Sequence, residues 1–169
     1  MKTEVRDRFG VLPAPRPLSR LQVFLKYWLP VLLCMALIFG FSTGAGSSQR
    51  TSRIIGPVLR WLIPGIADAT VNRVQTVVRK GGHVSEYAVL AWLLWRARRQ
   101  PVKDDPRPWR WSEAAFAIVV AALFAASDEI HQSFVPGREA RIGDVCIDTA
   151  GAALGLLALQ GQGRWRGKW

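Results

Sequence analysis

Four apolar blocks, each bounded by charged or aromatic residues, constrain the fold of this chain more than any other feature. The blocks are Trp28–Phe41, Val84–Trp95, Ala114–Ser127 and Val145–Leu159. Each is shorter than the roughly 20 residues that a helix needs to cross the hydrocarbon core of a bilayer. Aromatic and basic flanking residues lengthen the runs, as is typical at a membrane interface, and the first block extends back past Lys26 to Leu21.

The four blocks lack the polar stripe that a helix in a small soluble bundle presents to water. We therefore expect an all-α, polytopic membrane protein built as a bundle of four short transmembrane helices. A variant with three spans is the main alternative, because apolar runs of roughly 10 to 14 residues are also typical of buried core helices.

The composition agrees with a membrane protein. Half of the 169 residues are apolar, and the formal net charge is +11. This combination is typical of a protein whose basic loops lie against anionic lipid. Because the Lys and Arg residues are spread between the apolar blocks instead of forming one stripe, we expect membrane lipids as partners and no nucleic acid.

The length suits one domain. We expect a basic cytoplasmic arm over residues 1–20, a single transmembrane domain over 21–160 and a basic cytoplasmic tail over 161–169. Between the first two blocks, valines recur at helical spacing with polar residues between them, and Pro57 and Pro64 are expected to break the helices. This pattern predicts an amphipathic helical segment that lies on the membrane surface.

The distribution of basic residues predicts the orientation. The N-terminal arm with Lys26, the loop after the second block and the tail together hold 15 Lys and Arg, whereas the other two connections hold 8. With four spans, the positive-inside rule places both termini in the cytoplasm.

With this orientation, polar residues at the ends of three blocks all face the outside, which predicts one external site. The candidate polar cluster consists of His83, Tyr87, Asp128, Glu129, Gln132, Asp144 and Asp148, and the candidate anion-binding residues are Lys80, Arg138 and Arg141. The cations could hold a phosphate or a carboxylate, and the other groups are capable of acid–base chemistry. Lys80 and His83 are expected at the start of the second span, and a turn at Pro136-Gly137 would fold Arg138 over the helix ends.

Spacing supports convergence within each patch. Three pairs are four residues apart and share a helix face: His83 and Tyr87, Asp128 and Gln132, Asp144 and Asp148. Asp148 lies one turn inside an apolar helix, so it should face the protein interior and have a partner. Gly151 and Gly155 form a small-residue face on the same helix that lets a neighbouring helix approach closely. His131 departs from the face that Asp128 shares with Gln132, and we expect it to be exposed at the interface.

The two cysteines, Cys34 and Cys146, lie far apart within apolar segments. No Cys or His spacing indicates a disulfide scaffold or a metal site, and no motif indicates a cofactor. Both cysteines are therefore expected to be small apolar side chains in the core.

Three motifs together resemble the VanZ-like family of small bacterial membrane proteins over roughly residues 30–160. They are Lys80-x-x-His83-x-x-x-Tyr87, Asp128-Glu129-x-x-Gln132-x-Phe134-x-Pro136-Gly137-Arg138, and Asp144-x-x-x-Asp148-x-x-Gly151-x-x-x-Gly155. The chain departs from the family pattern in two places: a short insertion separates Phe41-Ser42 from Ser47-Ser48-Gln49, and Asp148 stands where many members carry Asn. The resemblance implies a bacterial inner-membrane protein with a cell-envelope role, in a family named after a protein linked to teicoplanin resistance.

Three functions fit these residues. The cluster could bind an envelope component, such as an anionic lipid or a lipid-linked precursor, in an accessory role. It could belong to a membrane-embedded enzyme acting on a lipid-linked phosphate or ester, although no HExxH or GxSxG motif is present. Alternatively, its buried ion pairs could only hold the short helices together.

Overall fold

This computed structural model describes residues 18–42, 48–102, 105–134 and 141–169. Within these ranges the chain consists of helices and their connections, with no strand. The elements are α1 (Arg20–Val23), η1 (Phe24–Trp28), α2 (Leu29–Ser42), α3 (Ser48–Leu62), α4 (Asp68–Arg99), α5 (Trp111–Gln132) and α6 (Ile142–Trp165). The prediction of an all-α protein is confirmed.

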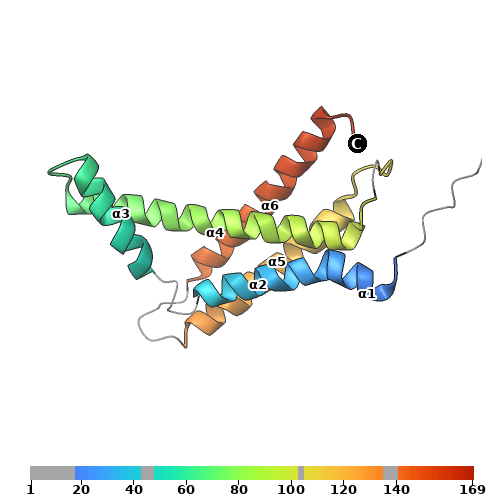
Figure 1. Ribbon diagram of the computed structural model, residues 1–169, viewed down its shortest axis with the longest axis horizontal. Coiled ribbons are helices and arrows are strands. Elements are labelled where there is room, and N and C mark those ends of the chain that lie inside the picture. Colours follow the sequence, from blue (N-terminus) through green and yellow to red (C-terminus); the bar gives the residue numbers. More distant parts are fainter. Residues whose placement is uncertain (1–17, 43–47, 103–104, 135–140) are drawn as a thin grey trace, which may run out of the picture.

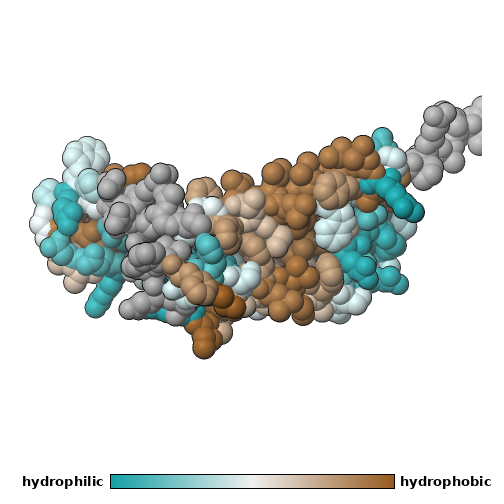
Figure 2. Space-filling model, turned by 90° about the horizontal axis from the view of Figure 1, so that it is seen from below, coloured by the Kyte–Doolittle hydropathy of each residue, from teal (hydrophilic) through white to brown (hydrophobic). Residues whose placement is uncertain are grey.

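Three helices in the described part of the chain have the length and composition of membrane spans: Arg20–Ser42, Trp111–Gln132 and Ile142–Trp165. A helix of 22 residues is about 33 Å long, enough for a hydrocarbon core of about 30 Å. The flanking residues therefore lengthen the first, third and fourth blocks as predicted. A hydrophobic band covers the middle of one face of the molecule, with hydrophilic surface at both ends (Figure 2). The second block does not meet this criterion, so the prediction of four spans is only partly confirmed.

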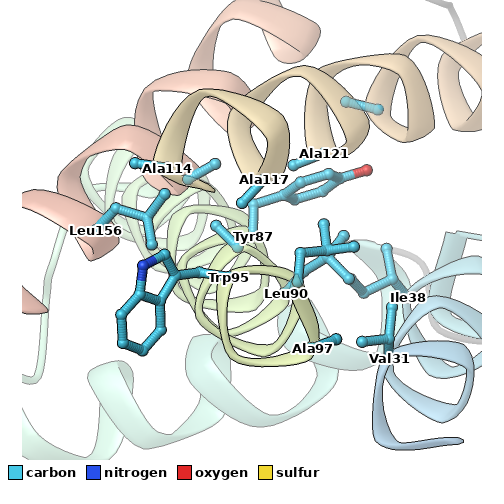
Figure 3. Close-up of a cluster of buried hydrophobic side chains, with 14 of the residues drawn as sticks. Val31, Ile38, Tyr87, Leu90, Trp95, Ala97, Ala114, Ala117, Ala121 and Leu156 are labelled. Carbon is cyan, nitrogen blue, oxygen red and sulfur yellow. The ribbon is translucent and has the colours of Figure 1, made fainter. Parts of the chain in front are cut away.

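α4 runs through the centre of the bundle and packs against α2, α5 and α6 (Figure 1). Its side chains form the middle of the hydrophobic core. Leu90 lies toward Val31 and Ile38, whereas Trp95 lies near Leu156 (Figure 3). The second block thus packs against all three apolar helices on one side, while Val89 and Trp92 on its other side remain exposed.

α4 is longer than the sequence predicted. Lys80 and His83 were expected at the start of a span, but the helix begins at Asp68 and extends without interruption to Arg99. Its first half projects beyond the ends of α2, α5 and α6 (Figure 1). The periodic valines are therefore part of the same helix as the second block, and α3 packs against them.

The expected break at Pro57 is also wrong, because Pro57 lies inside α3. A proline ring crowds the Cβ atom of the residue before it when that residue is helical. Here the preceding residue is Gly56, which has no Cβ, so α3 continues through the proline. The chain turns instead after α3, at Pro64 and Gly65, where Gly65 adopts a φ of 89°.

Proline also explains the contact between the first span and α4. Pro30 has no N–H to donate to the carbonyl of Lys26, and the helix widens to a π-helix over Phe24–Trp28. Arg96 Nη1 donates to that carbonyl oxygen at 2.9 Å. The guanidinium of Arg96 also lies 4.9 Å from the ring centroid of Tyr27, so α4 is joined to the first span by a basic side chain.

The predicted small-residue face of α6 is confirmed. A Cβ atom on Gly151 would lie 2.7 Å from the carbonyl oxygen of Val84, and one on Gly155 would lie 2.7 Å from Ala88 Cβ. Both distances are shorter than any real Cβ contact. The two glycines therefore allow the backbones of α4 and α6 to touch, which fixes the position of the polar residues on both helices.

α6 ends in a Schellman motif. Gly167 adopts a φ of 63°, the Lys168 N–H donates to the Gly163 carbonyl at 2.9 Å, and the Gly167 N–H donates to the Arg164 carbonyl at 3.0 Å. This turn brings Trp169 back over α6, where its indole N–H donates to the Gln160 carbonyl at 3.2 Å. Residues of the predicted tail thus pack on the bundle.

Candidate functional site

Polar side chains from four helices meet at one end of the bundle, and we call this group the polar cluster. It consists of Ser42 from α2, His83, Glu86 and Tyr87 from α4, Asp128, Glu129 and Gln132 from α5, and Asp144 and Asp148 from α6. All seven residues of the candidate polar cluster are in it. The lengths and packing of the helices bring them together, because α2 and α5 end at this level and α6 begins there.

Asp128 is the best-connected member of the polar cluster. It lies in the last turn of α5 and is 2 % exposed. Ser42 Oγ donates to Asp128 Oδ2 at 2.5 Å, and Gln132 Nε2 donates to the same oxygen at 2.8 Å. The predicted pairing of Asp128 with Gln132 along one helix face is therefore realised, and Ser42 adds a donor from a different helix.

Asp148 is 3 % exposed, and its partner is a histidine. His83 Nδ1 lies 3.7 Å from Asp148 Oδ1, which is an ion-pair distance when the imidazole is protonated but too long for a hydrogen bond. As predicted, Asp148 faces the protein interior. Glu129, Asp144, Asp128 and Glu86 are all close enough to interact with it electrostatically.

Glu129 connects α5 to the start of α6. The backbone N–H of Arg141, the N-cap residue of α6, donates to Glu129 Oε2 at 2.8 Å. This contact joins the last turn of α5 to the N-cap of α6. The Glu129 carboxylate therefore lies at the N-terminus of α6, where the helix dipole favours a negative charge.

Tyr87 lies at the centre of the polar cluster and is completely buried. Its ring lies beside Ala117 and Ala121 of α5 (Figure 3), and its hydroxyl group is close enough to four carboxyl groups to interact with them electrostatically. The hydroxyl oxygen nevertheless has no hydrogen-bond partner within the described part of the chain, and the same is true of Asp128 Oδ1, Asp148 Oδ1 and His83 Nδ1. Buried polar atoms of this kind are rare in proteins.

Of the three candidate anion-binding residues, the structure describes Lys80 and Arg141. Lys80 is exposed on the first half of α4, one turn before His83, and makes no ion pair with the residues that the structure describes. Arg141 contributes its backbone N–H to the cluster. Arg138 and the predicted turn at Pro136-Gly137 lie outside the described residues.

Two predictions need correction, one for His131 and one for Cys146. The ring of His131 is half-buried and lies 4.4 Å from that of Phe39, so it packs on the first span instead of standing exposed at the interface. Cys146 is exposed on α6 and not in the core, whereas Cys34 is partly buried, and both thiols are free.

The polar cluster is rich in hydrogen-bond acceptors. In the described ranges no three His, Cys, Asp or Glu side chains are grouped closely enough to hold a metal ion. No serine, threonine or cysteine nucleophile is hydrogen-bonded to His83 there either. The arrangement is therefore suited to binding a ligand that donates hydrogen bonds.

A second buried charge centre, which was not predicted from the sequence, lies at the opposite end of the bundle. The side chain of Arg99 is fully buried, with Nη1 3.0 Å from Glu113 Oε2 and Nε 3.3 Å from Asp105 Oδ2. Its guanidinium also donates to the carbonyls of Pro108 and Arg107. The signal was weak, because an arginine that follows an apolar block is normally interpreted as an interfacial residue.

Aromatic rings surround this arginine centre. The ring of Trp109 lies 5.3 Å from that of Trp95 and 5.6 Å from that of Trp169, and Arg99 lies 5.5 Å from the rings of both Trp95 and Trp169. A cleft of about 440 Å³ opens there, beside Trp95, Leu159 and Trp169. It lies far from the polar cluster and contains none of the predicted site residues.

In the loop at this end, Asp105 accepts hydrogen bonds from Arg107 Nη2 at 2.6 Å and from Arg107 Nε at 2.8 Å. These bonds, with the Arg107 backbone N–H and the charge of Arg99, hold the pKa of Asp105 well below its ordinary value. Asp105 is thus an ionised partner of the buried arginine, and Glu113 is its second acidic partner.

The family model for VanZ/LLP1 matches residues 27–160. The chain belongs to the VanZ/LLP1 family. This match spans the polar cluster, the glycine face of α6 and all three apolar spans, so the resemblance noted from the motifs is confirmed. No curated protein and no solved structure matches the chain. This VanZ/LLP1 protein is therefore an all-helical membrane protein whose site must be interpreted from its own geometry.

Proposed function

We propose that this VanZ/LLP1 protein is a binding or accessory protein of the bacterial cell envelope, and that the polar cluster recognises the head group of an envelope component. One observation carries the proposal: four helices of an apolar bundle direct buried polar side chains to a single point at one end. Ionisable groups within membrane segments are costly and usually mark a functional site.

The topology supports an outward-facing site. The second block of α4, Val84–Trp95, packs against α2, α5 and α6 and exposes Val89 and Trp92, so we propose it as the fourth span even though its apolar run is short. With four spans, the distribution of basic residues favours both termini in the cytoplasm and the polar cluster at the outer face of the inner membrane. The basic amphipathic helix α3, with Trp61 and Ile54 exposed, would then lie at the same outer surface.

The ligand that we propose is an anionic lipid or a lipid-linked precursor. Lys80, Arg138 and Arg141 would bind its phosphate or carboxylate, and the carboxylates of the cluster would orient the rest of the head group. Such a role agrees with the link between the family's name and resistance to the glycopeptide teicoplanin, because glycopeptides act on envelope precursors.

Native mass spectrometry of the full chain in detergent tests this proposal. The wild-type protein should retain an envelope lipid, and Arg138→Ala should release at least 90 % of it. Arg166→Ala is the matched control, since Arg166 is exposed at the opposite end of the bundle. A wild-type protein that retains no lipid of any class would contradict the binding role.

A membrane-embedded enzyme is the second candidate, and the His83–Asp148 pair is the observation that favours it. A histidine oriented by a carboxylate is a typical general base. If the cluster catalyses hydrolysis or transfer at a lipid-linked phosphate or ester, His83→Gln should abolish turnover at unchanged membrane abundance. Lipid mass spectrometry of cells that carry the wild-type or variant chain measures this turnover, and loss of abundance instead would indicate a structural role.

A further inference from the structure

Three acceptor atoms in the polar cluster belong to side chains that are at most 3 % exposed, yet they have no hydrogen-bond partner among the residues that the structure describes. They are Tyr87 Oη, Asp128 Oδ1 and Asp148 Oδ1. Leaving such atoms unpaired is energetically costly, and more so for a charged group. The atoms come from three different helices, and their residues are close enough to interact electrostatically with one another.

The other oxygen of Asp128 is already satisfied. Asp128 Oδ2 accepts from both Ser42 and Gln132, so the carboxylate is held in one orientation with Oδ1 left over. Asp148 Oδ1 has only the His83 ring nitrogen at 3.7 Å. Asp128 Oδ1 is therefore held in place before any ligand arrives, which lowers the entropic cost of binding.

A primary ammonium group matches this set of atoms in number and charge. It carries three N–H donors and one positive charge, and it has no acceptor. Three acceptors, two of them on carboxylates, are what it needs. A metal ion requires a tighter set of ligands, and the described side chains provide no group of three acidic, histidine or cysteine ligands at such spacing.

We infer that Tyr87, Asp128 and Asp148 form a binding site for a primary ammonium group carried by the head group that the polar cluster recognises. This inference rests on the proposed binding function. The side chain of His83 is 29 % exposed and lies beside Asp148, so the head group would enter past His83 from the end of the bundle. Lys80, one turn before His83 and exposed, is placed to meet the phosphate of the same head group.

Lipid competition on the full-length protein in detergent tests the inference. The probes are dioleoyl phosphatidylethanolamine, which has three N–H donors, dioleoyl phosphatidylcholine, which has none, dioleoyl phosphatidylglycerol, which has no amine, and free n-butylammonium. Native mass spectrometry gives the apparent affinity for each lipid. We expect phosphatidylethanolamine to bind at least tenfold more tightly than phosphatidylcholine, which has the same net charge but no N–H donor. Phosphatidylglycerol measures the binding that an anionic phosphate gives without an amine, and n-butylammonium should displace phosphatidylethanolamine from the site.

Two variants connect the preference to the site. Asp148→Asn removes one anionic acceptor and Tyr87→Phe removes the phenol oxygen, and each should reduce the preference to less than threefold. Asp68→Asn is the matched control, because that carboxylate is exposed on the projecting half of α4, and it should keep the wild-type preference. If Asp148→Asn does not fold, Tyr87→Phe decides, since it changes no charge.

The outcomes separate the inference from the function on which it rests. Equal binding of phosphatidylethanolamine and phosphatidylcholine overturns the ammonium site while leaving a head-group binding protein. A preference that survives in Tyr87→Phe also overturns it. Binding of n-butylammonium without any lipid supports the ammonium site and contradicts the lipid-binding function, and binding of no probe contradicts both.

Discussion

Ser42 Oγ donates a hydrogen bond to Asp128 Oδ2 at 2.5 Å, joining the last residue of α2 to the last turn of α5. Both residues are buried. The two helices touch little elsewhere, because α2 packs mainly on α4. This bond therefore positions the end of the first span and fixes the orientation of a carboxylate at the centre of the polar cluster.

Ser42→Ala should destabilise the protein by about 1 kcal/mol, since polar contacts between membrane helices contribute about 0.6 to 2 kcal/mol. Asp128 would keep only the bond from Gln132. Thermal or denaturant unfolding of the protein in detergent measures the loss. Ser85→Ala is the matched control, because the Ser85 hydroxyl bonds only the Gly81 carbonyl of its own helix. Equal effects of the two variants would show that the interhelical bond is not stabilising.

The close approach of α4 and α6 gives the second prediction. In Gly151→Ala the new methyl group would lie 2.7 Å from Val84 O and 2.8 Å from Val84 Cα, both backbone atoms that cannot move without shifting α4. Overpacking of this kind costs typically about 1 to 3 kcal/mol or more. We therefore expect Gly151→Ala to lower the unfolding temperature in detergent and to disrupt the polar cluster, whose α4 and α6 members would separate.

Gly143→Ala in the same helix is the control. Nothing lies within 4 Å of the position that its Cβ would take. Alanine is a better helix former than glycine by about 1 kcal/mol, so this variant should be neutral or slightly more stable than the wild type. Destabilisation by both substitutions would mean that α6 is sensitive to glycine replacement for a reason other than the contact with α4.

The sequence was sufficient to predict the helices and the position of the polar residues on them. Pairs four residues apart share a helix face whatever the tertiary structure, so Asp128 and Gln132 could be paired in advance. Gly151 and Gly155 could be interpreted as a contact face for a similar reason. The continuity of α4 could not be predicted with equal ease, because Gly81 and Gly82 weaken helix formation and separate the valines from the second block.

Contacts that depend on loops were beyond the sequence. Arg99 follows an apolar block, and its partners lie in the next loop (Asp105) and in the first turn of α5 (Glu113). No periodicity relates these three positions. Only the path of the loop brings the charges together. From the sequence, Arg99 was therefore interpreted as one of several basic residues at the membrane interface and not as the centre of a buried ion-pair group.

The third prediction concerns the loss of folding stability at acidic pH. Hydrogen bonds from Arg107 hold the pKa of Asp105 well below its ordinary value in the folded protein, whereas the unfolded chain has an ordinary aspartate pKa of about 3.9. The folded state therefore binds fewer protons, so this stabilisation is present above about pH 5 and is lost as the pH falls through 4 and below.

Asp105→Asn removes this dependence, and the unfolding temperature of the variant should fall less steeply than that of the wild type between pH 5 and pH 3. The variant should also be less stable than the wild type at pH 7, because Arg99 loses an ionised partner. Asp68→Asn, which changes a largely exposed carboxylate, should follow the wild-type curve. If the unfolding temperature of Asp105→Asn falls between pH 5 and pH 3 as steeply as that of the wild type, the lowered pKa of Asp105 is not the cause of the acid sensitivity.

The fourth prediction couples the end of α6 to the aromatic rings around Arg99. A Cβ atom on Gly163 would lie 2.1 Å from Trp169 Cε2, so Gly163→Ala must displace that indole from its place against Trp109 and Arg99. We expect a loss of about 1 to 3 kcal/mol in the wild-type background. In a Trp169→Ala background the clash disappears, and the same substitution should be neutral or stabilising through its helix propensity. A double-mutant cycle should therefore give a coupling energy of about 1 to 3 kcal/mol between the two positions, whereas strictly additive effects would show that Trp169 does not pack over Gly163 in the membrane protein.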